Sequence, residues 1–118
     1  MSIQLQKLSL KAKFFRGLGD STRLSILEIL REGEKITSEI VKRTGQSQSN
    51  ISNHLACLLD CGLVTNRRVG KNIIYKLSNE KIIKLLEEGD AILLDFAHGI
   101  YSCINYNDDQ SRHVEPSK

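Results

Sequence analysis

Two cysteines four residues apart are the first feature of this sequence that could do chemistry. Cys57 and Cys61 stand in the segment 49–64, SNISNHLACLLDCGLV, which has the residue pattern of a helix. Residues four apart on a helix lie on one face with Cβ atoms ~5–6 Å apart, so two thiolates there could share one ion. Thiolates are soft ligands and favour soft or borderline metals such as Cd(II), Pb(II) and Zn(II). The spacing therefore indicates a metal site.

Two other interpretations of these thiols stay open from the residues alone. A free cysteine can be a small buried hydrophobe. Cys57 and Cys61 lie roughly 110–150° from the centre of the apolar stripe formed by Ile51, Leu55 and Leu58, however, which disfavours burial in the core. The pair could also be a redox sensor, although a disulfide between residues four apart in a helix would be strained.

Composition limits the class of protein. The chain has 118 residues, of which 40% are apolar and 26% charged, with a net charge of +3. This balance is that of a globular domain, and the mild basic charge is compatible with nucleic acid. No apolar run approaches the roughly 18 residues of a membrane span, and the first residues show no signal-peptide pattern. We expect a cytoplasmic protein with no membrane partner, in which three cysteines fit metal or redox chemistry better than disulfides.

The elements that must position the thiols follow from apolar periodicity. The predicted helices in the first half of the chain cover 5–18, 21–31, 38–44 and 48–61. Polar residues before the later helices are the expected N-caps: Asp20, Thr37 and Ser47. The second helix should face the core with Leu24, Leu27, Ile29 and Leu30. Gly62 stands where a left-handed C-cap would end the fourth helix.

After Gly62 the pattern changes to that of β-strands. The runs 63–68 and 72–77, joined through Val69, Gly70 and Lys71, predict a hairpin. A last helix is expected over 80–103, with a break at Gly89 left open. The polar segment 107–118 is expected to be a disordered tail, which leaves one domain over 1–106.

This order of elements predicts a mainly α fold with a small β-hairpin, a winged helix-turn-helix. The fourth helix carries short donors and acceptors near its start, as a helix in the major groove of DNA requires. The expected DNA contacts are Gln48, Ser49, Ser52 and Asn53 on this helix, and Arg67, Arg68 and Lys71 on the hairpin. A solvated polar surface, or a winged helix that binds only protein partners, are the alternatives. The sequence has no nucleophile–base pair, phosphate loop or paired carboxylates, so an enzyme is not expected.

The first and last helices carry more apolar surface than a monomer of this size can easily cover. We therefore expect a symmetric homodimer formed through these two helices. The candidates for its interface are Phe14, Phe15, Leu18, Ile82, Leu86, Leu93 and Phe96.

Several of these residues also carry a family resemblance over residues 8–106. They are 19–23 before and within the second helix, Ser49, Ser52, His54, Leu55 and Leu58 on the fourth, 62–64 after it, and Gly70 and Tyr75 in the hairpin. The sequence resembles the ArsR/SmtB family of metal-responsive winged-helix repressors. Within that family, Cys57, Cys61 and Gly62, with Cys103 late in the last helix, resemble the CmtR-type cadmium/lead sensors.

The resemblance implies a homodimer that binds an inverted-repeat operator when metal-free and is released by metal, which switches on efflux or resistance genes. It implies the ligands Cys57, Cys61 and Cys103, and we expect Cys103 to come from the other subunit. Three thiolates suit Cd(II) or Pb(II) better than Zn(II), whose sites are nearly always four-coordinate. The metal sites of other branches of the family are not intact in this sequence. Ile36 and Ser38 stand where one branch has cysteines, and Ile92 stands where another has a histidine.

Overall fold

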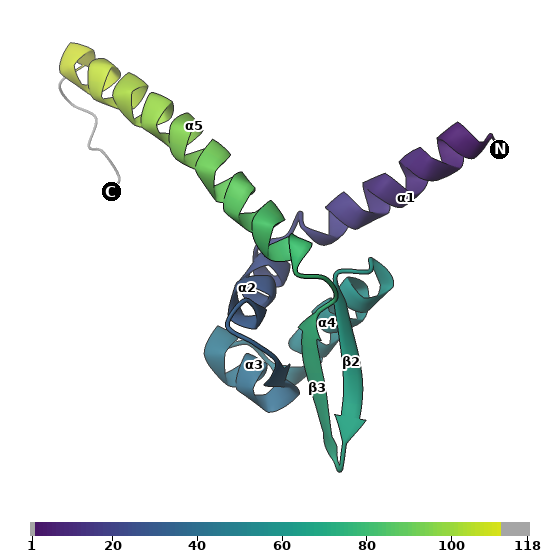
Figure 1. The fold of residues 1–118 in the computed structure, drawn as a ribbon. Coiled ribbons are helices and arrows are strands. Elements are labelled where there is room, and N and C mark those ends of the chain that lie inside the picture. Colours follow the sequence, from purple (N-terminus) through teal and green to yellow (C-terminus); the bar gives the residue numbers. More distant parts are fainter. Residues whose placement is uncertain (1, 112–118) are drawn as a thin grey trace. The chain divides into compact units, whose positions relative to one another are not determined.

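The structure is a computed structural model that describes the backbone of residues 2–111 and the side chains of residues 2–99. The chain divides into two compact units, Met1–Ile82 and Ile83–Lys118. The elements in chain order are α1 (Ile3–Gly17), α2 (Ser21–Leu30), β1 (Lys35–Ile36), α3 (Thr37–Thr44), α4 (Gln48–Asp60), β2 (Val64–Val69), β3 (Asn72–Leu77) and α5 (Lys81–Ser111) (Figure 1). The predicted fold class, a mainly helical winged helix-turn-helix, is confirmed.

The ends of α2 and α4 follow the predicted capping residues. The Asp20 carboxylate accepts a hydrogen bond from the Arg23 amide at 3.1 Å, and the Ser47 hydroxyl accepts one from the Asn50 amide at 3.1 Å. Gly62 has a φ of 80°, a left-handed conformation that suits glycine and ends α4 as expected. Asp20 thus fixes where α2 begins, and Ser47 and Gly62 fix where α4 begins and ends.

The predicted capping role of Thr37 is wrong. Helix α3 begins at Thr37 itself, and its N-cap residue is Ile36, which makes no side-chain cap bond. Ile36 is held in the extended conformation because it pairs with Ile74 of β3. The Thr37 hydroxyl instead donates to the Ile73 carbonyl at 3.5 Å, which joins the start of α3 to the hairpin.

A short strand that the sequence pattern does not reveal completes the sheet. Lys35 and Ile36 form β1, which pairs antiparallel with β3, and the strand order is β1-β3-β2. Two residues are too few to show an alternating pattern, so the prediction contained only the hairpin. Within the hairpin, Val69 pairs with Asn72, and Gly70 has a φ of 63° in the intervening two-residue turn.

The core lies between α2, α3, α4 and the sheet. Its fully buried side chains are Ile26, Leu27, Ile40, Ile51, Leu55, Leu58 and Leu63. Leu24, which we expected to face this core, is 37% exposed, and Ile26 is buried in its place. The four buried residues of α2 are Ile26, Leu27, Ile29 and Leu30, and Leu24 lies about 140° from the centre of the arc that they form, at 100° per residue.

The N-terminal helix α1 buries little of its own surface. Gly17 is its one buried residue, and its exposed large apolar side chains are Ile3, Leu5, Leu8, Leu10 and Phe15. A helix that exposes this many apolar side chains leaves a surface that a partner could cover.

The second unit is formed by most of α5. The helix continues through Gly89 without the break that the sequence left open; a glycine in a helix costs only about 1 kcal/mol relative to alanine. It also runs to Ser111, past the predicted end at 103 and into the segment expected to be a tail. No proline precedes position 116 to stop it, while residues 112–118 lie outside the described part. Its exposed large apolar residues are Ile92, Leu93, Leu94 and Phe96.

The described helices were also searched for a membrane span. None of them combines the length and the hydropathy that crossing a bilayer requires.

Candidate nucleic-acid interface and thiol site

The first turns of α4 present a polar surface to solvent. Gln48, Ser49, Ser52 and Asn53 are all exposed. The opposite stripe of the helix, Ile51, Leu55 and Leu58, is at most 1% exposed and fixes the orientation of α4 against the core. The free backbone amides of a helix N-terminus attract phosphate, so this end of α4 has the donors that DNA contacts need.

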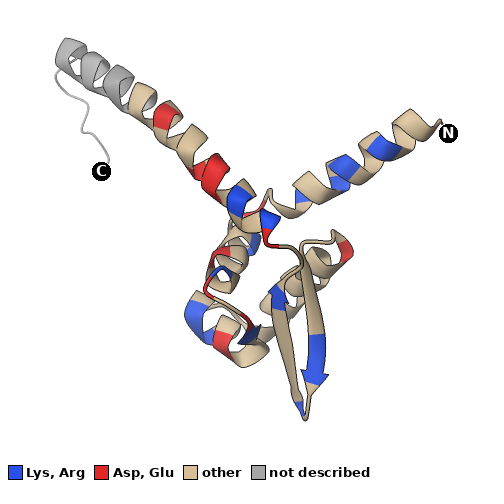
Figure 2. Cartoon of the chain, viewed as in Figure 1, with Lys and Arg blue, Asp and Glu red and all other residues tan. Residues whose placement is uncertain are grey.

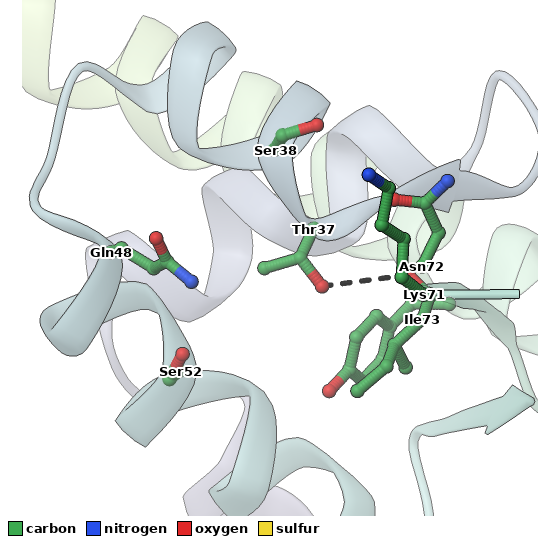
Figure 3. Close-up of a pocket in the computed structure, with 8 residues that line it drawn as sticks. Thr37, Ser38, Gln48, Ser52, Lys71, Asn72 and Ile73 are labelled. Atoms are coloured by element: carbon green, nitrogen blue, oxygen red, sulfur yellow. Dashed lines mark hydrogen bonds between the residues drawn. The ribbon is translucent and has the colours of Figure 1, made fainter. Parts of the chain in front are cut away.

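An open hollow of about 250 Å³ joins the start of α4 to the hairpin. It is lined by Thr37 and Ser38 of α3, Gln48 and Ser52 of α4, Lys71 between the strands, and Asn72, Ile73 and Tyr75 of β3. Figure 3 shows these side chains around the hollow, with the Thr37–Ile73 hydrogen bond on its α3 side. The structure therefore brings together three predicted contact residues, Gln48, Ser52 and Lys71.

The hollow also contains polar residues that the sequence reasoning missed. Thr37 and Ser38 stand at the start of α3 and line the same surface. Their position depends on β1, which places the start of α3 beside β3. Prediction of a strand at Lys35 and Ile36 would have revealed this placement. A strand of two residues is too short to show a recognisable sequence pattern.

Figure 2 marks in blue the positions of lysine and arginine along the hairpin and at its tip. The side chains of these basic residues have different surroundings. Arg67 donates to both carboxylate oxygens of Glu34, at 2.7 and 3.2 Å. These hydrogen bonds lower the pKa of Glu34 and raise the pKa of Arg67. Arg68 follows it in β2 and so lies on the other face of the strand, and both Arg68 and Lys71 are exposed. Arg67, among the three predicted cations of the hairpin, is thus the one shown paired with a carboxylate within the described side chains.

Gln46, in the turn before α4, ties α4 to α2. The Gln46 amide nitrogen donates to the Thr22 hydroxyl at 2.8 Å, and the Gln46 amide oxygen accepts from the Asn50 side chain. The turn between α3 and α4 is therefore held to α2 and to the first turn of α4 by one side chain.

At the other end of α4 the two thiols interact with each other. Cys57 and Cys61 are free cysteines, and both are half-buried. Burial raises the pKa of Cys61, and the nearby Cys57 thiol raises it further through charge repulsion and a hydrogen bond. The Asp60 carboxylate acts in the same direction, whereas Lys13, which forms an ion pair with Asp60 at 3.1 Å, acts weakly against it. The pair thus shares one face of α4, as the spacing predicted.

The last turn of α1 packs directly on Cys61. A Cβ atom at Gly17 would lie 3.1 Å from the Cys61 sulfur and 2.7 Å from a Leu63 methyl group. Any side chain at position 17 would therefore have to displace the thiol and a fully buried leucine. Cys61 lies in contact with two elements, its own helix and α1.

The third predicted ligand, Cys103, lies in the α5 backbone, but its side chain is outside the described residues. Within the described side chains, no three His, Cys, Asp or Glu residues are grouped so that they could hold a metal. What the described part offers is two sulfur donors on one helical face, a donor set that fits soft ions.

Known proteins share this arrangement of elements. Residues 20–66 match the model of the bacterial regulatory protein, arsR family. The chain is 38% identical over 92 residues, 78% of its length, to 74% of a probable mercury resistance operon repressor from Streptomyces lividans. The solved structure of the cadmium metal-sensor CMTR from Mycobacterium tuberculosis is 36% identical, with a TM-score of 0.58, over 65% of this chain and 80% of that one.

A homodimeric winged helix-turn-helix DNA-binding domain from Mycobacterium bovis matches in fold. Its TM-score is 0.72, with 23% identity over 98% of this chain and 96% of that one. These relatives and neighbours are DNA-binding regulators and not enzymes, in agreement with the sequence-based expectation. The polar start of α4, the adjacent hairpin and the sequence match lead to one conclusion: the chain belongs to the arsR family of bacterial regulatory proteins.

Proposed function

We propose that this protein is a transcriptional repressor that binds its operator as a metal-free homodimer and is released by a soft metal ion. The observation that carries the proposal is the position of two features on one helix. The start of α4 lines the polar hollow beside the hairpin, and its end carries the Cys57–Cys61 pair. A ligand at one end of this helix can therefore affect what the other end contacts.

The DNA-binding part of the proposal assigns α4 to the major groove. The amide side chains of Gln48 and Asn53 can form paired hydrogen bonds with a base edge, and Ser49 and Ser52 suit base or phosphate contacts. Arg68 and Lys71 supply charge to the phosphate backbone from the hairpin. Arg67 contributes less in this scheme, because Glu34 already neutralises it.

A dimer is supported by the apolar surfaces that α1 and α5 each expose, and by the homodimeric relative in fold. In a two-fold dimer, two α4 helices would enter successive major grooves about 34–36 Å apart. This spacing predicts an operator with an inverted repeat in double-stranded DNA.

The inducing metal is inferred from the donors and from the relatives. Cys57 and Cys61, with Cys103 of the partner subunit as the third ligand, would offer three thiolates, which suits Cd(II) or Pb(II) better than Zn(II). The similarity to a cadmium sensor and a mercury resistance repressor supports a soft metal. The regulated genes would then be those of metal efflux or resistance, and the protein would act in the cytoplasm.

The test is a mobility-shift titration on the DNA upstream of the protein's own gene, with and without Cd(II), Pb(II), Zn(II) and peroxide. We expect tight binding without metal and release by Cd(II) or Pb(II). Cys57→Ser and Cys61→Ser should bind the same DNA but lose both the thiolate–metal absorbance and the release. Binding that no metal weakens would contradict the sensing part, and no binding at all would contradict the repressor.

A thiol-based redox sensor is the second candidate function, and the position of two free thiols, Cys57 and Cys61, on one face of α4 favours it. The raised pKa of Cys61 opposes it, because the thiolate is the reactive form and a raised pKa makes it scarcer. Release by peroxide, reversed by a reductant and without a metal absorbance band, would favour this alternative.

A further inference from the structure

The guanidinium of Arg23 joins the end of α1 to the middle of α4. From the first turn of α2, its Nε donates to the Gly17 carbonyl at 3.0 Å and its Nη2 donates to the Arg16 carbonyl at 2.9 Å. Its Nη1 lies 3.4 Å from Nδ1 of His54 on α4. The last carbonyls of a helix have no partner within the helix, so Arg23 caps α1 from outside it.

His54 is placed to accept this third hydrogen bond. Its side chain is 18% exposed, and Arg23 has only donors, so Nδ1 must be unprotonated when it accepts from Nη1. The carboxylate of Asp20 lies 3.7 Å from the same nitrogen and caps the Arg23 amide. Arg23 is therefore fixed at its backbone by Asp20 and at its side chain by α1 and α4.

The same junction has two further contacts between α1 and α4. Lys13 pairs with Asp60 at 3.1 Å, and the backbone of Gly17 packs on Cys61. His54, Cys57 and Cys61 are separated by three and four residues, which places them along one side of the helix. The side of α4 that meets the end of α1 thus carries both the Arg23 contact and the thiols.

We propose that Arg23 and His54 are positioning residues that fix the recognition helix relative to α1, and that discrimination between operator and random DNA depends on this bond. The inference rests on the proposed function, in which α1 belongs to the dimer interface. Each α4 must then hold a defined direction relative to α1 for both copies to enter their half-sites. A fixed direction lowers the ordering cost of binding both half-sites. Binding to random DNA depends mainly on phosphate charge and does not require a fixed direction of α4.

Two variants of His54 separate the hydrogen bond from packing. His54→Phe keeps a ring of similar size but removes the acceptor, whereas His54→Gln keeps an acceptor that Arg23 can reach. Arg23→Lys keeps the positive charge, but its single ammonium cannot place donors at the separate positions of Nε, Nη1 and Nη2. Arg43→Gln is the control, because the guanidinium of Arg43 on α3 is likewise held by hydrogen bonds, but to the two carboxylate oxygens of Glu32 and not to α1 or α4. Operator and random-DNA affinities are measured without metal, together with the thermal midpoint and the dimer mass.

We expect His54→Phe and Arg23→Lys to weaken operator binding about tenfold, the scale of one charged hydrogen bond, with random-DNA affinity within about twofold of the wild type. His54→Gln and Arg43→Gln should keep the wild-type ratio of the two affinities. The inference is overturned if His54→Phe, folded and dimeric, keeps that ratio, or if all four variants lower it equally. If the wild type itself does not prefer its operator, the proposed function fails instead.

Discussion

At the scale of single residues, the pairing of Arg67 with Glu34 separates two arginines that the sequence presents as equivalent. Arg67 and Arg68 are consecutive residues of β2, and both were predicted to contact DNA. Their roles could not be distinguished beforehand, because Glu34 is distant in sequence and reaches Arg67 only after the hairpin has folded beside β1.

The arginine pair gives a prediction on salt dependence. Arg68→Ala should weaken operator and random DNA alike and reduce the slope of log affinity against log salt by about one. Arg67→Ala should reduce that slope by clearly less, since Glu34 competes with phosphate for its charge. Fluorescence anisotropy titrations over a range of salt concentrations measure both slopes, and equal slopes would show that the Glu34 pair opens on DNA.

Asn53 gives a prediction of a different kind. It is exposed on the polar side of α4, where an amide can bond a base edge. Asn53→Ala should lower operator affinity by about 1–3 kcal/mol but leave random-DNA affinity and the salt slope nearly unchanged. Competition between labelled operator and random DNA measures the difference, and an equal loss on both DNAs would assign Asn53 to phosphate.

The raised pKa of Cys61 predicts how metal affinity depends on pH. Metal binding must displace the Cys61 proton, and the thiol remains protonated below its raised pKa. The apparent Cd(II) affinity should therefore rise with pH, by about tenfold per unit for this proton alone. Thiolate absorbance titrations in a competing chelator measure the slope. Cys61→Ser should show a shallower slope, and an unchanged one would remove Cys61 from the ligands.

At the scale of elements, the sequence was informative where one local rule decides the structure. Ser47 and Gly62 mark the two ends of α4, as predicted. A serine cap and a left-handed glycine depend only on neighbouring residues, so the sequence alone reveals them. The stripe of Ile51, Leu55 and Leu58 is buried as its period indicates. The predictions failed where a residue distant in sequence determines the local structure. Pairing of Ile36 with Ile74 forms β1 and makes Ile36, not Thr37, the N-cap residue of α3.

The N-cap of the recognition helix gives a prediction on stability. Ser47→Ala removes the hydroxyl that accepts from the Asn50 amide and should cost about 1 kcal/mol of unfolding free energy. Ser47→Gly should cost only a few tenths, because glycine leaves the amides open to water. Urea unfolding followed by circular dichroism measures both, and equal losses would indicate that the hydroxyl contributes through another contact.

At the scale of the whole molecule, the exposed apolar side chains of α5 bear on the proposed dimer. Leu93 and Phe96 are each at least 60% exposed. Leu93→Glu should convert a micromolar dimer to a monomer and weaken operator binding, because one half-site alone retains little affinity. Sedimentation gives the mass and anisotropy gives the affinity. Asp95→Glu, a conservative exchange on the same helix, is the control and should remain dimeric.

The dimer also allows a test of where the third thiolate comes from. Subunits carrying Cys57→Ser and Cys61→Ser, mixed with Cys103→Ser subunits, should form heterodimers with one complete three-thiolate site. The Cd(II) absorbance of the mixture should exceed that of either parent. A mixture that only averages its parents, while the wild type binds normally, would place all ligands within one subunit.

The contact between Gly17 and Cys61 has a consequence for how this sequence can change over evolution. Position 17 has no room for a methyl group as long as Cys61 and Leu63 keep their places. Residues 17, 61 and 63 should therefore covary among natural relatives, with larger side chains at 17 appearing only where the other two have become smaller. Gly89, which has open space around it, should vary freely by comparison. An alignment deep enough to measure pairwise covariation would show whether lineages that lost the thiols also filled position 17.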